Sequence, residues 1–229
     1  TTMVDTGDGW FMVGKKTIKD THANGTIDLS TIIQKSSNVG TSKVALALPK
    51  EMLWDVFSSF GFGKDTASSF PGETFGKLVQ PRKIHAIEQA TLSFGYGLTT
   101  TALQLAQVYS TIARLGKIIP VSFLKVDGQP QVTAKVSIAP IYIKTVIKMM
   151  ERVLQPGGTA ATVAIPGYRV AGKTGTVKKS SNAGGYTEKD YMAVFAGFAP
   201  LSNPRLAMAV MIDEPSESGF YGGVVAGPV

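Results

Sequence analysis

The sequence contains no cysteine and only two histidines, His22 and His85. The absence of cysteine excludes disulfide bonds, zinc sites with cysteine ligands and thiol nucleophiles. The two histidines lack the short spacing of metal ligands, so we expect no metal site, and a Ser-His-Asp mechanism has few candidates. No apolar run approaches the roughly 18 to 20 residues that span a bilayer, and residues 1–14 show no secretory signal.

The composition that remains is typical of a globular protein. The chain has 229 residues, of which 44% are hydrophobic and 17% charged, so a wholly disordered or fibrous chain is excluded. Its net charge of +7 could suit nucleic acid, an anionic membrane surface or an anionic substrate. The basic residues are scattered as short pairs such as Lys15-Lys16, with no basic helix and no RNP-type motif. We therefore do not expect a nucleic-acid partner.

Hydrophobic spacing predicts a mainly helical part over about residues 28–160. We expect helices from residue 28, after residue 37, from 49 to 61, at 82–92, at 101–115 and at 140–154. Ser36-Ser37-Asn38 interrupts the first two helices, and either Ser37 or Asn38 should cap the second. Residues 61–78 have the composition of a loop. Residues 118–132 read as a hairpin around Asp127-Gly128.

A strand-rich part follows, over about residues 161–229. Its three strand-like segments, 168–179, 191–200 and 205–215, are joined by connections that contain Gly or Pro and Asn. This pattern predicts an antiparallel meander. Helices gathered apart from an antiparallel sheet make an α+β fold.

Lys173-Thr174-Gly175-Thr176 lies in the first of these predicted strands. The motif places an ammonium and two hydroxyls along one strand, and Gly175 leaves room for another backbone to approach. Such a strand can hold an extended peptide while the cation and the hydroxyls bind its terminal carboxylate. The alternative is a solvated basic strand end.

Ser36-Ser37-Asn38, taken alone, is explained by helix capping. The two motifs are informative together, because one is predicted on a helical turn and the other on a strand. A Ser-x-Asn turn that faces a Lys-Thr-Gly strand across a cleft forms two thirds of the constellation of serine penicillin-recognising enzymes.

Longer stretches carry a resemblance to a known family. They are IIQKSSNVGTSKVAL, FGFGKDT, FPGE, LSFGYGLTTTALQLAQVYSTIA, VAGKTGTVKK, FAGFAP, IDEPS and YGGVVAGPV. In this order they resemble the transpeptidase domain of class B penicillin-binding proteins, most closely the division-specific, penicillin-binding protein 3 type. The resemblance implies a penicillin-binding transpeptidase fold, similar to serine β-lactamases, with a helical lobe and an antiparallel sheet lobe. Residues 1–229 would then be a partial transpeptidase domain, incomplete at both ends.

The family's nucleophile is not in this chain. It is the serine of a Ser-x-x-Lys motif, which in the family lies further upstream of Ser-x-Asn than this chain extends. The chain does contain Ser122-Phe123-Leu124-Lys125, but about one such match is expected by chance, and it follows Ser36 in a predicted hairpin. We interpret it as coincidental. Without the family's nucleophile helix, two further strands and last helix, we expect the chain alone neither to be acylated nor to fold stably.

The resemblance implies a D-Ala-D-Ala transpeptidase. A serine would attack the carbonyl between the two terminal D-alanines of a peptidoglycan stem peptide, and β-lactams would inhibit because they imitate that bond. Ser36 and Lys173 would relay a proton toward the leaving amine, and Asn38 would hydrogen-bond the substrate amide or the absent motif's lysine. Thr174 and Thr176 would bind the substrate carboxylate with Lys173, and the Thr176 N–H would form half of the oxyanion hole.

Further substrate-binding positions follow from the same resemblance. Ser37 and Gly175 belong to the two motifs. Tyr186, Phe220 and Tyr221 match aromatic positions that in the family form a wall beside the antibiotic side chain, although aromatic residues in a sheet lobe can equally serve packing.

The resemblance implies no cofactor and no metal. Lys178 is either a basic position of the site or a solvated strand end.

The implied partners are peptidoglycan stem peptides, β-lactams and other division proteins. The implied location is the periplasmic face of the bacterial inner membrane, with an N-terminal anchor that is not in this chain.

Two other functions stay open. A serine β-lactamase would need a general base for deacylation, and Glu73 in FPGETFG is a candidate, although that segment matches the transpeptidase pattern. A non-enzymatic β-lactam sensor or division scaffold of the same fold would need no nucleophile at all.

Overall fold

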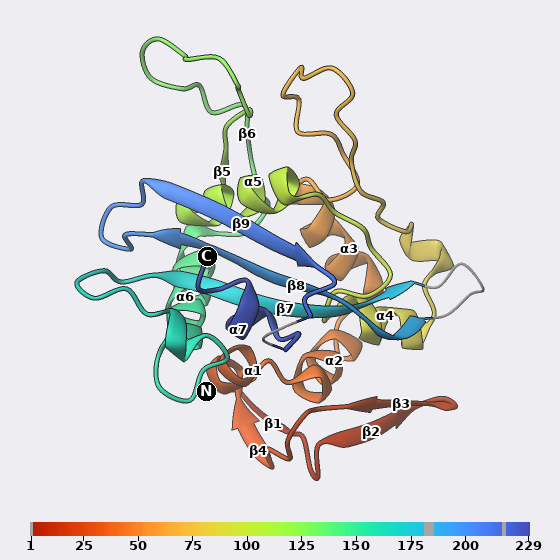
Figure 1. Cartoon of the computed structure of the whole chain (residues 1–229). Coiled ribbons are helices and arrows are strands. Elements are labelled where there is room, and N and C mark those ends of the chain that lie inside the picture. The colour runs from red at the N-terminus through yellow and green to blue at the C-terminus, as the bar shows by residue number, and fades with distance from the viewer. Residues whose placement is uncertain (1, 181–185, 217–218) are drawn as a thin grey trace.

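The computed structural model describes residues 2–180, 186–216 and 219–229, and a long antiparallel sheet runs through its middle (Figure 1). The sheet consists of β7 (Ala171–Ser180), β8 (Tyr186–Ala199) and β9 (Leu206–Asp213), in the order β7-β8-β9. The predicted meander is therefore confirmed. Its middle strand is longer than expected, because β8 begins at Tyr186 and not at residue 191.

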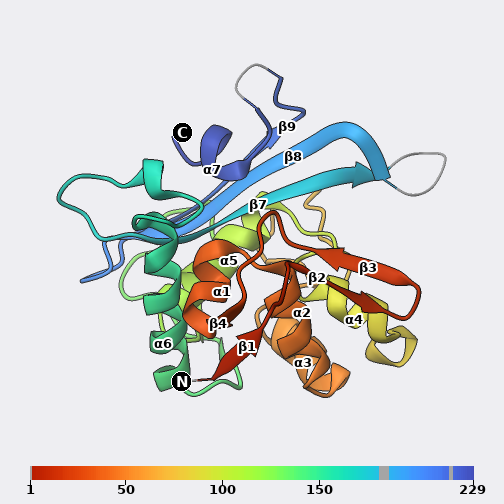
Figure 2. The ribbon, with the colours of Figure 1, turned by 90° about the horizontal axis from the view of Figure 1, so that it is seen from below.

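Helices cover both faces of this sheet. On one face, Ala171 and Phe198 pack against Met150 of α6 (Pro140–Glu151) and Ile112 of α5 (Ala102–Ala113). On the other face, Ala193 and Phe195 pack against the 3₁₀ helix η2 (Arg152–Leu154) and the segment of α7 (Gly222–Val225). Figure 2 shows α7 on the opposite side of the sheet from α6. The alternation of side chains along each strand produces the two apolar faces.

The remaining helices lie where the hydrophobic spacing predicts them. They are α1 (Leu29–Lys35), α2 (Asn38–Leu46), α3 (Lys50–Ser59) and α4 (Ala86–Leu92), which the 3₁₀ helix η1 (Pro81–Lys83) precedes; the 3₁₀ helix η3 (Ala161–Val163), by contrast, lies where no helix was predicted. The predicted helix at 82–92 is divided, since His85 adopts an extended conformation and begins α4 with a capping box that includes Glu88. Residues 61–78 form a loop, as expected.

Two short antiparallel strand pairs that were not predicted precede α1. β1 (Met3–Asp5) pairs with β4 (Thr26–Asp28), and β2 (Trp10–Val13) pairs with β3 (Lys16–Lys19). Val13 and Ile18 are buried against Val39 of α2 and Ala90 of α4. The β2–β3 hairpin is thus fixed beside the start of α2.

The hairpin predicted at 118–132 is only partly correct. β5 (Lys117–Ile118) and β6 (Ala134–Lys135) pair at the base, and the loop between them extends away from the sheet (Figure 1). Pro120 and Pro130 lie in this loop and lack the N–H that a strand ladder needs. Among the residues that the structure describes, no helix has the length and apolar character to cross a membrane.

Candidate active site

Ser36 lies at the junction of α1 and α2. It ends α1 in the left-handed conformation, with φ 57° and ψ 46°, which is uncommon for a residue with a Cβ. Ser37 then begins α2, because its Oγ accepts a hydrogen bond from the Gly40 N–H at 2.9 Å. The predicted cap is confirmed as Ser37. Strained backbone of this kind is often found at functional sites.

Lys173 on β7 reaches this junction. Its Nζ donates to Ser36 Oγ at 2.8 Å and to the Thr174 carbonyl oxygen at 2.9 Å. Burial lowers the pKa of the Lys173 ammonium from 10.5 to about 8, because desolvation disfavours the charged form. The structure therefore brings the two predicted motifs together and leaves a lysine that can gain or lose a proton near neutral pH beside a serine hydroxyl.

Asp20, which directly follows β3, stabilises the turn formed by Ser36 and Ser37. Its carboxylate accepts hydrogen bonds from the Ser37 hydroxyl and, at 2.9 Å, from the Val39 N–H. Asn38 Nδ2 donates to the Lys19 carbonyl oxygen at 3.1 Å. Asp20 could not be selected from the sequence, since a single aspartate seventeen positions before Ser37 has no spacing that points to this contact.

Ser37 is almost fully buried, with 2% of its surface exposed. Its hydroxyl is used within the protein by the Gly40 N–H and the Asp20 carboxylate. The predicted contact of Ser37 with substrate stays a prediction, and its observed contacts are structural.

The two threonines of the β7 motif have partners on different segments. Thr176 Oγ1 accepts from the Gly222 N–H at 3.0 Å, and Thr174 Oγ1 lies 2.7 Å from Thr159 Oγ1. A Cβ on Gly222 would lie only 2.3 Å from the Gly175 carbonyl oxygen. Glycine at position 222 thus allows the start of α7 to dock on β7 and to place a donor beside Thr176.

An aromatic cluster lies at the same end of the site. The rings of Tyr191 and Phe220 stack with centroids 4.2 Å apart, and Phe220 lies 4.6 Å from Tyr221. Lys178 Nζ is 5.9 Å from the centre of the Tyr191 ring, within cation–π range. The structure thus joins two of the predicted aromatic residues with Tyr191, which the sequence analysis did not select, whereas the Tyr186 side chain is outside the described side chains.

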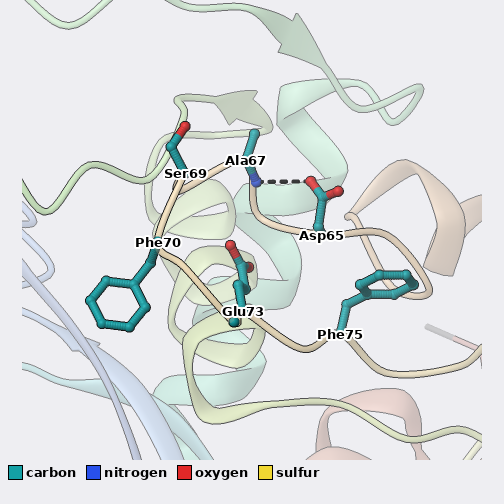
Figure 3. A pocket seen from close by; sticks show the side chains of 7 residues that line it. Asp65, Ala67, Ser69, Phe70, Glu73 and Phe75 are labelled. Carbon is teal, nitrogen blue, oxygen red and sulfur yellow. Dashed lines mark hydrogen bonds between the residues drawn. The ribbon is translucent and has the colours of Figure 1, made fainter.

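Glu73, the candidate base of the β-lactamase alternative, lies in the 61–78 loop. Figure 3 shows a pocket in this loop, with Glu73 between Phe70 and Phe75. The Glu73 carboxylate accepts from the Thr66 N–H at 2.9 Å, the Thr66 hydroxyl at 2.6 Å and the Ser68 hydroxyl. These hydrogen bonds, that from Ser68 first, lower its pKa to about 2. A carboxylate stabilised in this way is a poor general base near neutral pH.

Ser122, the coincidental Ser-x-x-Lys serine, lies in the exposed loop between β5 and β6. Its hydroxyl donates to the Leu124 carbonyl oxygen at 2.7 Å and accepts from the Leu124 N–H at 3.1 Å. It thus closes a local turn and does not begin a helix. In the described part of the chain, no group of three or more His, Asp or Glu side chains is placed to hold a metal ion.

The chain is similar to known proteins over nearly its whole length. Residues 1–229 match the family model of the penicillin binding protein transpeptidase domain. The chain is 46% identical over 220 residues to the probable peptidoglycan D,D-transpeptidase PenA of Neisseria flavescens, covering 96% of this chain and 54% of that protein. It is 47% identical over 212 residues to the peptidoglycan D,D-transpeptidase FtsI of Escherichia coli K12, covering 93% of this chain and 36% of that protein.

A solved structure has a similar fold. The apo transpeptidase domain of Burkholderia pseudomallei penicillin-binding protein 3 superposes with a TM-score of 0.92 at 41% identity, over 99% of this chain and 68% of that one. The chain spans only about a third to a half of the length of the curated relatives named above.

Proposed function

The chain belongs to the penicillin-binding protein transpeptidase domain family, and from that premise we propose that it forms the substrate-binding part of a serine D,D-transpeptidase. Its fold, helices on both faces of an antiparallel sheet, is that of the family. The proposed reaction crosslinks peptidoglycan stem peptides at the division septum. The observation that carries the proposal is the 2.8 Å contact between Lys173 Nζ and Ser36 Oγ.

We propose that the nucleophile is the serine of a Ser-x-x-Lys segment outside this sequence. Residues 1–229 are then a partial transpeptidase domain, with a mainly helical lobe over about 28–160 and the three-stranded part of the sheet lobe over about 161–229. We call this chain joined to that segment the complete domain. The proposed assignment predicts that acylation needs the complete domain.

The substrate is proposed to bind along β7. Among the described residues β7 has no strand partner other than β8, and we propose that an extended peptide pairs with its other edge. Thr174 and Thr176, with Lys173, would hold the terminal carboxylate by charge-assisted hydrogen bonds. The Thr176 N–H would stabilise the oxyanion that forms on the attacked carbonyl, an interaction typically worth about 2.7 to 4 kcal/mol of barrier.

Proton transfer is proposed to pass through Ser36. Acyl transfer moves a proton from the nucleophile to the leaving D-alanine amine, so a group near the leaving nitrogen must donate it. Lys173, with a pKa of about 8, can supply a proton to Ser36 Oγ. Because Asn38 Nδ2 is held by the Lys19 carbonyl oxygen, the Asn38 Oδ1 atom is left to accept from the substrate amide or from the lysine of the Ser-x-x-Lys segment.

β-Lactams are proposed to acylate the serine of the Ser-x-x-Lys segment, with their side chains beside the cluster of Tyr191, Phe220 and Tyr221. Tyr186 is kept as a predicted member of that wall. Other division proteins are proposed partners, and the periplasmic face of the inner membrane is the proposed location. The support for these statements is the similarity to FtsI and PenA.

The test uses the complete domain and a fluorescent penicillin. We expect one covalent label per molecule, slow loss of that label, release of D-alanine from a stem-peptide substrate, and little nitrocefin turnover. Rapid nitrocefin turnover would favour the β-lactamase alternative, against which the hydrogen-bonded, low-pKa Glu73 argues. A label without any D-alanine release would favour the sensor, and neither label nor release would favour the scaffold.

A further inference from the structure

Thr159 contacts the substrate-binding strand from a segment to which the sequence analysis gave no role. Its Oγ1 lies 2.7 Å from Thr174 Oγ1. Thr159 is exposed, whereas Thr174 is half-buried. A hydroxyl at the surface of the site therefore touches the hydroxyl that is proposed to bind the substrate carboxylate.

The segment that carries Thr159, residues 155–160, is held at three points. Gln34 Nε2, on the last turn of α1, donates to the Pro156 carbonyl oxygen at 3.2 Å. Ala160 is fully buried in the core beneath the sheet. A Cβ on Gly223 would lie 2.0 Å from the Thr159 carbonyl oxygen, so α7 packs directly on the Thr159 backbone. These contacts fix the Thr159 hydroxyl relative to β7.

The proton count of the two hydroxyls defines what Thr159 can do. Each threonine hydroxyl has a single proton and can both donate and accept. When Thr174 donates its proton to a ligand carboxylate, it keeps the contact with Thr159 only if Thr159 is the donor. A hydroxyl that accepts one hydrogen bond also becomes a stronger donor.

We propose that Thr159 is a positioning residue for carboxylate recognition: its hydroxyl donates to Thr174 Oγ1 and so directs the Thr174 proton toward the terminal carboxylate of the substrate or inhibitor. This inference rests on the proposed transpeptidase function. It assigns Thr159 a role that acts through Thr174 and is felt only by ligands that carry the carboxylate.

The test compares two ligands and matched variants of the complete domain. The second-order acylation rate constant is measured with benzylpenicillin, which has the carboxylate, and with its methyl ester, which lacks the charge. Thr159→Val should lower the rate with benzylpenicillin by roughly ten-fold, the size expected for one hydrogen bond near a charged group, and the rate with the ester by less than about two-fold. Thr159→Ser should restore the rate, and Thr162→Val, an exposed threonine of η3, is the matched control.

A second measurement separates positioning from folding. In a Thr174→Val background, Thr159→Val should have no further effect, because the partner through which it acts is gone. An unchanged benzylpenicillin rate, equal losses with both ligands, or a full loss in the Thr174→Val background would overturn the inference while the acylated parent keeps the proposed function. A parent that benzylpenicillin does not acylate would instead refute the proposed function, and this inference with it.

Discussion

We predict that the titration of Lys173 raises the free energy of unfolding between neutral pH and mild alkali. Burial lowers its pKa from 10.5 to about 8 in the folded protein. Each pKa unit corresponds to about 1.4 kcal/mol, so the charged ammonium costs the folded state about 3 kcal/mol near pH 7. Between pH 8 and 10.5 the unfolded chain holds a proton that the folded protein has lost, and the free energy of unfolding rises with pH in that window.

The variant Lys173→Met isolates this effect, because it keeps the chain length and removes the titrating group. The complete domain and the variant are unfolded with urea from about pH 7 to about pH 9.5. The stability of the parent relative to Lys173→Met should rise by about 2 kcal/mol over that range. Lys144→Met, an exposed lysine on α6, corrects for the loss of one positive charge.

A stability difference that stays constant with pH would refute this reasoning. It would mean that the Lys173 ammonium is as well solvated in the folded protein as in the unfolded chain. The low pKa that we propose for proton transfer to Ser36 would then lose its physical cause.

Three further substitutions follow from the contacts around the site. Asp20→Ala removes the acceptor for Ser37 and should lower the free energy of unfolding by about 1 to 3 kcal/mol, as measured by urea denaturation, together with the rate of acylation. Gly222→Ala forces a Cβ against the β7 backbone, and we expect a loss of about 1 to 3 kcal/mol and a lower melting temperature; an unchanged value would place α7 elsewhere. Phe220→Ala breaks the stack with Tyr191 and should weaken inhibition by β-lactams with aromatic side chains several-fold, but not by those with small side chains, which an inhibition assay would show.

Much of the fold could be predicted because its elements are marked by local patterns. The 3.6-residue spacing located the helices, and the segments around Gly175 and Gly197 had the alternation and turns of a meander. The short strands of residues 3–28 were missed, since three or four residues carry too little periodicity to stand out. The hairpin predicted at 118–132 is only partly correct, because Pro120 and Pro130 lack the N–H groups that would extend the β5–β6 ladder into the loop.

The candidate site also contains residues that the sequence predicts and residues that it does not. Ser36 and Lys173 could be paired in advance because each lies in a motif that the family resemblance orders along the chain. Asp20 and Thr159 could not, since their contacts depend on how separate segments pack. Tyr191 shows the same limit: it lies on a predicted strand, and its stacking on Phe220 follows only from the position of the segment before α7 beside β8.

The central claim is that Lys173, in contact with Ser36, activates acyl transfer, and the acylation rates of one lysine variant and one serine variant test it most directly. We measure the second-order rate constant for fluorescent penicillin with the complete domain, with Lys173→Ala and with Ser122→Ala. The account predicts a loss of at least about a hundred-fold for Lys173→Ala, of the size that general acid–base groups contribute, and an unchanged rate for Ser122→Ala. Normal acylation of Lys173→Ala, with loss in Ser122→Ala, would contradict it.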